Sequence, residues 1–126
     1  EQQCIDRMKE SFTRSMKLRE HMEWLVGRGG MWTHRNEVLF FHACVPVNKD
    51  GTPQTLRVDG RDLSGRELME GLESVVRRAM RKRWFGIDND ADMIYYLWGG
   101  PQSPLFGKEK LTTFENHFVA DKAAHK

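Results

Sequence analysis

The sequence predicts an α+β protein in which helices pack on a small, mainly antiparallel sheet. Apolar residues recur every three or four positions over residues 5–26 and 64–83, as in amphipathic helices. Short β-prone runs are joined by turn-forming pairs such as Asp59-Gly60. Capping-box patterns at Ser64–Glu67 and Thr112–Glu115 indicate two helix starts, so helices and hairpins share one chain.

The N-terminal half contains one predicted helix and one predicted hairpin. Residues 5–26 form the helix, and the glycine-rich segment 27–30 ends it. Residues 31–34 and 37–45 are the arms of the hairpin. The second arm contains Val38-Leu39-Phe40-Phe41, an unbroken apolar run. Such a run is typical of a strand that is covered on both faces.

The second half begins with a short strand at 54–58 and a long helix. This helix, 64–83, is predicted to bury an apolar stripe: Leu68, Leu72, Val75, Val76 and Ala79. Asp88-Asn89-Asp90 can cap a shorter helix that follows. Residues 99–110 form a loop rich in glycine and proline, and the second capping box opens a final helix.

Size and composition exclude several classes of protein. The 126 residues fit one domain, and we interpret residues 1–126 as a single partial domain, because the chain opens on Glu1 and stops in a charged, helix-like run. A net charge of +2 does not demand a nucleic-acid partner. No apolar run approaches the roughly 20 residues that cross a bilayer. Two cysteines without metal-binding spacing indicate reduced thiols and a cytoplasmic protein.

An apolar strand that ends in an imidazole is the most distinctive local pattern. Residues 38–41 lead into His42, followed by the small Ala43. Ligands gather at the carboxyl ends of strands in many sheets, and a neutral imidazole binds manganese, iron or zinc. On spacing alone, a hydrogen-bonded core histidine is the commoner role.

Two further segments have both a functional and an ordinary interpretation. The loop 97–108 combines glycine, proline and a hydroxyl, so Ser103, Lys108 and Lys110 could face a substrate phosphate. A connector with solvated lysines is the alternative. The basic run 77–83 could bind a polyanion, although at helical spacing a solvated face is more common.

Four segments together resemble the class III (bacterial) fructose-1,6-bisphosphatases. They are KLREHMEWLVGRGGM at 17–31, LFFHACVPVNKD at 39–50, YYLWGGPQSPLF at 95–106 and GKEKLTTFENHFVADKAAHK at 107–126. The resemblance spans nearly the whole chain, and the loop 98–108 together with Thr112–Glu115 is its most specific part. It identifies the chain as an internal segment of a longer protein of this family.

The resemblance implies a calcineurin-like metallophosphoesterase fold and a hydrolase of gluconeogenesis. A two-metal centre, expected to hold Mn²⁺, would activate a water against the 1-phosphate of fructose 1,6-bisphosphate, giving fructose 6-phosphate and phosphate. In related phosphoprotein phosphatases a strand ends in His-Gly-Gly, whose histidine binds a metal. His42 occupies the matching place, with Ala43 in place of the first glycine.

The other metal-binding motifs of the superfamily are absent from these residues. Asp-x-His, Gly-Asp-x-x-Asp and Gly-Asn-His-Asp/Glu do not occur. One histidine cannot hold two divalent ions, so we expect the isolated chain to be inactive. A regulatory or oligomerisation subdomain is the alternative function, and an open sheet edge beside the His42 strand would favour a homo-oligomer.

Overall fold

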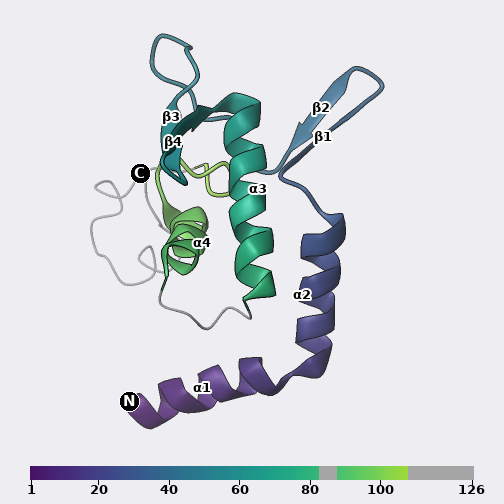
Figure 1. The fold of residues 1–126 in the computed structure, drawn as a ribbon, viewed down its shortest axis with the longest axis vertical. Coiled ribbons are helices and arrows are strands. Elements are labelled where there is room, and N and C mark those ends of the chain that lie inside the picture. The colour runs from purple at the N-terminus through teal and green to yellow at the C-terminus, as the bar shows by residue number, and fades with distance from the viewer. Residues whose placement is uncertain (83–87, 108–126) are drawn as a thin grey trace, which may run out of the picture. The chain divides into compact units, whose positions relative to one another are not determined.

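The computed structural model describes residues 1–82 and 88–107, which belong to two compact units, Glu1–Gly30 and Met31–Lys126 (Figure 1). Both helices and strands are present, which confirms the α+β class. The strands form two separate antiparallel hairpins, so the described residues contain no single sheet of the kind predicted. No helix among them is long and apolar enough to cross a membrane.

The first unit consists of two helices, α1 (Gln2–Arg14) and α2 (Met16–Arg28). The prediction of one helix over 5–26 was wrong at Ser15, where the backbone is extended. The Ser15 hydroxyl accepts a hydrogen bond from the Leu18 amide at 3.2 Å and so caps α2. Because a serine cap satisfies an amide that a helix start leaves unpaired, the chain begins a new helix here.

The apolar stripe of α1 is exposed. Ile5, Met8 and Phe12 are 47%, 57% and 62% exposed, and neither helix of this unit contains a buried residue. The helical periodicity of α1 was predicted correctly, because residues 2–14 do form a helix. The surface that would cover the stripe does not lie within the unit.

The second unit has its core between α3 (Gly65–Arg81) and the hairpin of β3 (Thr55–Val58) and β4 (Arg61–Ser64). The predicted stripe on α3 is confirmed, with Met69 added and Val76 only partly buried. Leu68 and Leu72 are completely buried. Asp59 and Gly60 form the predicted turn, and both have positive φ angles.

The start of α3 lies where the sequence predicted it, but the capping box does not form. Ser64 is the residue before the helix, yet its side chain makes no capping hydrogen bond. Ser64 is also the last residue of β4 and pairs with Thr55. Gly65 then adopts a φ angle of +52°, which turns the strand directly into the helix.

The other hairpin consists of β1 (Trp32–Arg35) and β2 (Val38–Phe41). Its turn is Asn36-Glu37, one residue later than predicted, and both residues have positive φ angles. The prediction that β2 is covered on both faces was wrong for the described residues, because all four of its side chains are exposed. No third strand lies beside this hairpin in the part of the chain that the structure describes.

A shorter helix, α4 (Asn89–Gly99), packs on α3. Asp88 caps it as predicted, because its carboxylate accepts hydrogen bonds from the amides of Asp90 and Ala91. A run of turns from 100 to 107 follows α4. The predicted capping box at 112–115 lies outside the described residues.

Candidate functional site

His42 follows the last residue of β2 and its side chain is exposed. Among the described residues, His42 is therefore not part of a core. An exposed imidazole at a strand end is accessible to a metal ion without any rearrangement of a protein core.

The segment that follows His42 is joined to the loop after α4. The amides of Ala43 and Cys44 both donate hydrogen bonds to the Pro104 carbonyl oxygen at 3.2 Å. The Cys44 thiol approaches the Ser103 carbonyl oxygen at 3.6 Å. Burial raises the pKa of this thiol, and the Gly107 backbone opposes that rise. The structure thus brings the segment after His42 next to the glycine- and proline-rich loop that follows α4.

Gly107 makes the close approach of these segments feasible. Its φ angle is +60°, a conformation that favours glycine. A Cβ atom at this position would lie 3.1 Å from the Cβ of Ala43. The methyl group of Ala43 therefore lies against a glycine.

Ser103 is completely buried, unlike a side chain that faces solvent. Its hydroxyl donates to the Leu97 carbonyl oxygen at 2.7 Å and accepts from the Leu105 amide at 3.2 Å. The hydroxyl thus ties the end of α4 to the following loop. Substrate contact by Ser103 stays a prediction, while Lys108 and Lys110 lie outside the described residues.

Replacing Ser103 by alanine is expected to lower the free energy of unfolding by about 1–2 kcal/mol. The Leu97 carbonyl and the Leu105 amide would both lose a partner inside the protein. Thermal denaturation followed by circular dichroism measures the effect. Ser11→Ala is the matched control, since the exposed Ser11 hydroxyl donates only to Met8 in its own helix. A Ser103→Ala change no larger than that of Ser11→Ala would contradict the role of the buried hydroxyl.

The described residues do not form a metal centre by themselves. They contain no group of three or more histidine, cysteine, aspartate or glutamate side chains placed to hold an ion. His42 can supply one neutral nitrogen donor. Any centre that includes His42 needs donors from outside the described residues, and these residues alone complete no metal chemistry.

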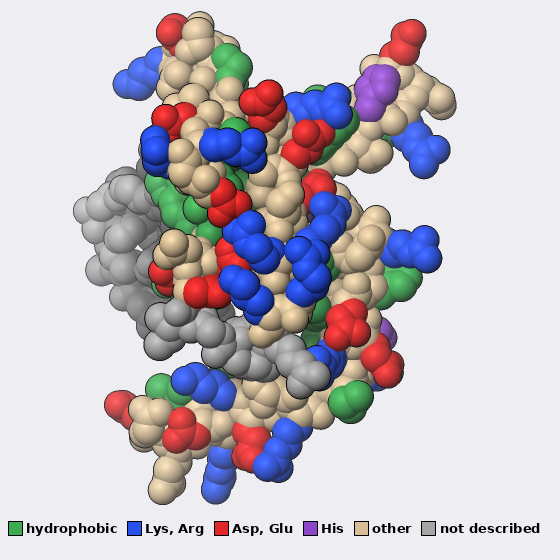
Figure 2. Space-filling view, in the orientation of Figure 1, with side chains coloured by type: hydrophobic (Ala, Val, Ile, Leu, Met, Phe, Trp, Pro, Cys, Tyr) green, Lys and Arg blue, Asp and Glu red, His purple; other side chains and the backbone are tan. Residues whose placement is uncertain are grey.

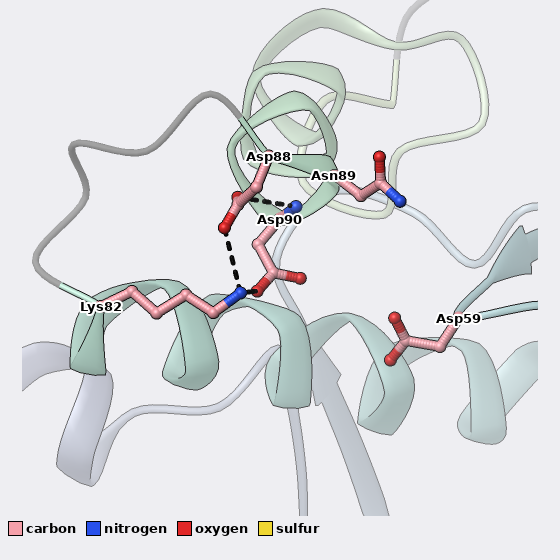
Figure 3. Close-up of a pocket in the computed structure, with 5 residues that line it drawn as sticks. All are labelled: Asp59, Lys82, Asp88, Asn89 and Asp90. Atoms are coloured by element: carbon pink, nitrogen blue, oxygen red, sulfur yellow. Dashed lines mark hydrogen bonds and ion pairs between the residues drawn. The ribbon is translucent and has the colours of Figure 1, made fainter.

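A network of charged side chains joins α3, the start of α4 and the β3–β4 turn. Arg78 donates to both carboxylate oxygens of Asp90, at 2.9 and 3.0 Å from its Nε, and to those of Asp59 at 2.8 and 2.9 Å. Lys82 donates to Asp88 at 3.0 Å and to Asp90 at 2.8 Å. Figure 3 shows Lys82 reaching from α3 toward the two aspartates, with Asp59 on the other side of the pocket.

The electrostatics of this network favour the charged forms of Asp90, Arg78 and Lys82. Arg78, and then Lys82, holds the pKa of Asp90 far below its usual range. The aspartates in turn raise the pKa values of Arg78 and Lys82. With three carboxylates around two cations, the pocket has no excess positive charge for a phosphate. We therefore interpret it as a structural clamp.

Most of the basic side chains that the structure describes in the run 77–83 are paired with carboxylates. Arg77 pairs with Glu73 at 3.0 Å, while Arg78 and Lys82 pair with aspartates. Figure 2 shows Lys and Arg side chains along α3 with Asp and Glu side chains beside them.

The helix cap at Asp88 was visible in the sequence. The pairing of Asp90 with Arg78 was not, because no local spacing relates residues on two different helices.

Replacing Asp90 by asparagine is expected to lower the free energy of unfolding by about 2 kcal/mol at pH 7. The Asp90 side chain is only 6% exposed, so Arg78 and Lys82 lose a desolvated partner. The folded-state pKa of Asp90 is depressed. The contribution of its carboxylate to the free energy of unfolding is therefore fully present above the unfolded-state pKa of about 3.9, and it is lost as the pH falls below that value. The difference from wild type should therefore shrink below about pH 4.

Asp62→Asn is the matched control for this substitution. Asp62 pairs with Arg57 at 3.2 Å, but its side chain is 63% exposed. Such a pair contributes at most about 1 kcal/mol. Urea denaturation of both variants between pH 2 and 7 compares them. Equal effects of the two substitutions would show that Asp90 is no more than a surface charge.

Comparison with known proteins gives one consistent result. Residues 1–126 match the family model described as Firmicute fructose-1,6-bisphosphatase. Proteins named fructose-1,6-bisphosphatase class 3 are similar along almost the whole chain. That of Lacticaseibacillus casei (strain BL23) is 44% identical over 125 residues, 99% of this chain. That of Staphylococcus epidermidis is 41% identical over 126 residues, and that of Streptococcus sanguinis is 40% identical over the same length.

The chain spans about a fifth of the length of the curated relatives it matches, 19% for the first and 20% for the Streptococcus sanguinis protein. No solved structure matches the chain.

Proposed function

Because this chain belongs to the Firmicute fructose-1,6-bisphosphatase family, we propose that it is part of an enzyme that hydrolyses fructose 1,6-bisphosphate to fructose 6-phosphate and phosphate. The single observation that carries the proposal is the match of all 126 residues to the family, with 44% identity to one named relative. The chain contributes a fifth of such a protein, so the activity belongs to the whole. We further propose that the whole protein acts in gluconeogenesis, in the cytoplasm.

The proposed enzyme has a calcineurin-like metallophosphoesterase fold and a centre of two divalent ions, with Mn²⁺ as the expected metal. Bound metals would polarise the phosphoryl oxygens and lower the pKa of an attacking water. His42 would supply one ligand. Its exposure at the end of β2 and the two hydrogen bonds that fix the next two residues support this role.

The loop at 97–108 is proposed as part of the wall that faces the substrate. Its residues Pro104 and Gly107 lie against the segment that follows His42, so a group bound near His42 would be close to this part of the loop. Ser103 is proposed to shape the wall through its buried hydrogen bonds, and Lys108 and Lys110 to face a phosphate. Ammonium groups beside a phosphate are favourable because the attraction is charge-assisted.

A second candidate, a regulatory or oligomerisation subdomain, is favoured by one observation. The α1 stripe and the β2 side chains form exposed apolar surfaces, which typically mark contacts with other protein surfaces. On this proposal His42→Ala in the full-length protein would leave turnover unchanged and alter the oligomer size. Loss of turnover with unchanged size would favour the enzymatic role.

The test of the proposed function is phosphate release from fructose 1,6-bisphosphate by the full-length protein with added Mn²⁺. We expect fructose 6-phosphate and phosphate in equal amounts, and no release from fructose 6-phosphate. The 126-residue chain should release no phosphate under the same conditions. A full-length, folded, metal-loaded protein that leaves fructose 1,6-bisphosphate intact would contradict the proposal, and so would turnover by the short chain.

A further inference from the structure

Ser103 lies at the centre of the turns that follow α4, and each of its polar groups has a hydrogen-bond partner. Its amide donates to the Gly100 carbonyl oxygen at 3.0 Å, and its carbonyl oxygen accepts from the amides of Phe106 and Gly107, both at 3.2 Å. Its hydroxyl joins the end of α4 to the same turns. Because Ser103 is completely buried, solvent does not compete for these bonds, and they fix the backbone on both sides of the residue.

Tyr96, in the last turn of α4, supports the first part of these turns. Its hydroxyl oxygen accepts a hydrogen bond from the Gln102 amide at 3.2 Å. The Gly100 amide donates to the Tyr96 carbonyl oxygen at 2.6 Å, and a Cβ atom at Gly100 would lie 2.5 Å from the Tyr96 ring. The ring therefore occupies the space that a side chain at 100 would need. Tyr96 and Ser103 together hold residues 100–103.

One peptide unit connects Ser103 with the segment that follows β2. The Pro104 carbonyl and the Leu105 amide belong to this unit, which is planar. The Ser103 hydroxyl accepts from the Leu105 amide at 3.2 Å. On the opposite side of the same unit, the Pro104 carbonyl oxygen accepts from the amides of Ala43 and Cys44. The hydroxyl thus sets the orientation of the carbonyl to which these two amides are bound.

We propose that Ser103, with support from Tyr96, is a positioning residue for His42. Its hydroxyl holds the peptide unit that in turn holds the two amides directly after His42. The inference rests on the proposed function in taking His42 as a metal ligand. Because the imidazole is exposed, no core fixes its direction, which depends on the backbone beside it. A ligand has to stay within about 0.5 Å of its productive position, so fixing the next two residues favours metal binding.

Direct contact between the Ser103 hydroxyl and a substrate phosphate is a different role. A hydroxyl has one proton to donate. The Ser103 hydroxyl donates this proton to the Leu97 carbonyl oxygen at 2.7 Å, so donation to a phosphate would require a buried hydrogen bond to break. The two roles also differ in their kinetic effect, because loss of a substrate contact raises KM, whereas loss of a positioning bond weakens metal binding.

The Ala43 methyl group measures the positioning directly, because Ala43 follows His42 and its methyl axis moves with the backbone. In the metal-free full-length protein, labelled with ¹³C at alanine methyl groups, we expect an order parameter of about 0.85 for this axis. At a temperature where Ser103→Ala is fully folded, this substitution should lower the value below about 0.6. An order parameter that is unchanged in Ser103→Ala would overturn the proposal.

The affinity for Mn²⁺ is the second quantity to measure. We expect the Kd of Mn²⁺ to rise at least about 10-fold in full-length Ser103→Ala, as is typical when a group that orients a metal ligand is lost. Val58→Ala is the matched control for general destabilisation, because Val58 is 1% exposed and belongs to β3, which packs on α3. It should unfold more easily than wild type and keep the Ala43 order parameter and the Mn²⁺ affinity. An equal rise in Kd in Val58→Ala would overturn the assignment.

Tyr96→Phe is a milder second variant. It keeps the ring that lies against Gly100 and removes only the hydroxyl that accepts from Gln102. If Ser103→Ala does not fold, this variant carries the test. A smaller fall in the Ala43 order parameter is then expected, and no fall would overturn the proposal.

Phosphate release is measured separately, so the two proposals can fail independently. A protein that releases no phosphate, but in which Ser103→Ala lowers the Ala43 order parameter and weakens Mn²⁺ binding, would remove the proposed activity and leave the positioning role in place. An active protein in which Ser103→Ala changes neither quantity would remove the positioning role alone.

Discussion

Replacing His42 by alanine in the full-length protein is expected to lower kcat for phosphate release by at least about 100-fold and to reduce the amount of bound Mn²⁺. The imidazole is the donor that we assign to the proposed centre, and a methyl group cannot replace it. Because the side chain is exposed, its loss leaves no cavity in the core. The thermal unfolding temperature of the metal-free protein should therefore stay unchanged.

His34→Ala is the matched control. His34 lies on β1 of the same hairpin, opposite Leu39, and its side chain is also exposed. It should keep wild-type turnover and metal content. Steady-state kinetics and elemental analysis of both variants make the comparison. Equal turnover by His42→Ala and wild type would show that His42 is not a ligand of the metal centre.

Replacing Leu72 by alanine is expected to lower the free energy of unfolding by about 3 kcal/mol. Leu72 is completely buried in the centre of α3. The substitution removes apolar contacts and leaves a cavity that the surrounding helix and hairpin fill only in part. Urea denaturation of the 126-residue chain, followed by circular dichroism, measures the change in the midpoint.

Leu25→Ala makes the same chemical change at a position on α2 that is 55% exposed. It should change the free energy of unfolding by less than about 0.5 kcal/mol. Similar effects of the two substitutions would mean that α3 does not organise a core. The comparison matters for the site, because α3 supports α4, and the loop after α4 holds the segment that follows His42.

Local patterns were sufficient for elements whose partners lie nearby in the chain. The apolar stripe of α3 was predicted from its spacing, and Asp59-Gly60 from the turn chemistry of a two-residue hairpin. The break at Ser15 was missed because the apolar periodicity of Ile5, Met8 and Phe12 continues through it to Met16. Serine is a strong helix cap, and that signal was present in the sequence.

Features that depend on distant residues could not be predicted. The apolar run of β2 predicted a strand covered on both faces, yet no described residue supplies that cover. The contact between the His42 segment and Pro104 joins two segments that are far apart in the chain. Asp90 and Arg78 likewise meet only because α4 packs on α3. Spacing within a single element contains no information on such contacts.

Pulsed electron paramagnetic resonance of the Mn²⁺-loaded full-length protein tests the central claim most directly, because it detects imidazole nitrogen bound to the metal. We predict a histidine nitrogen coupling in the wild-type protein that is lost or diminished in His42→Gln and kept in His34→Gln. A spectrum that is identical in wild type and His42→Gln, at equal manganese content, would contradict the account.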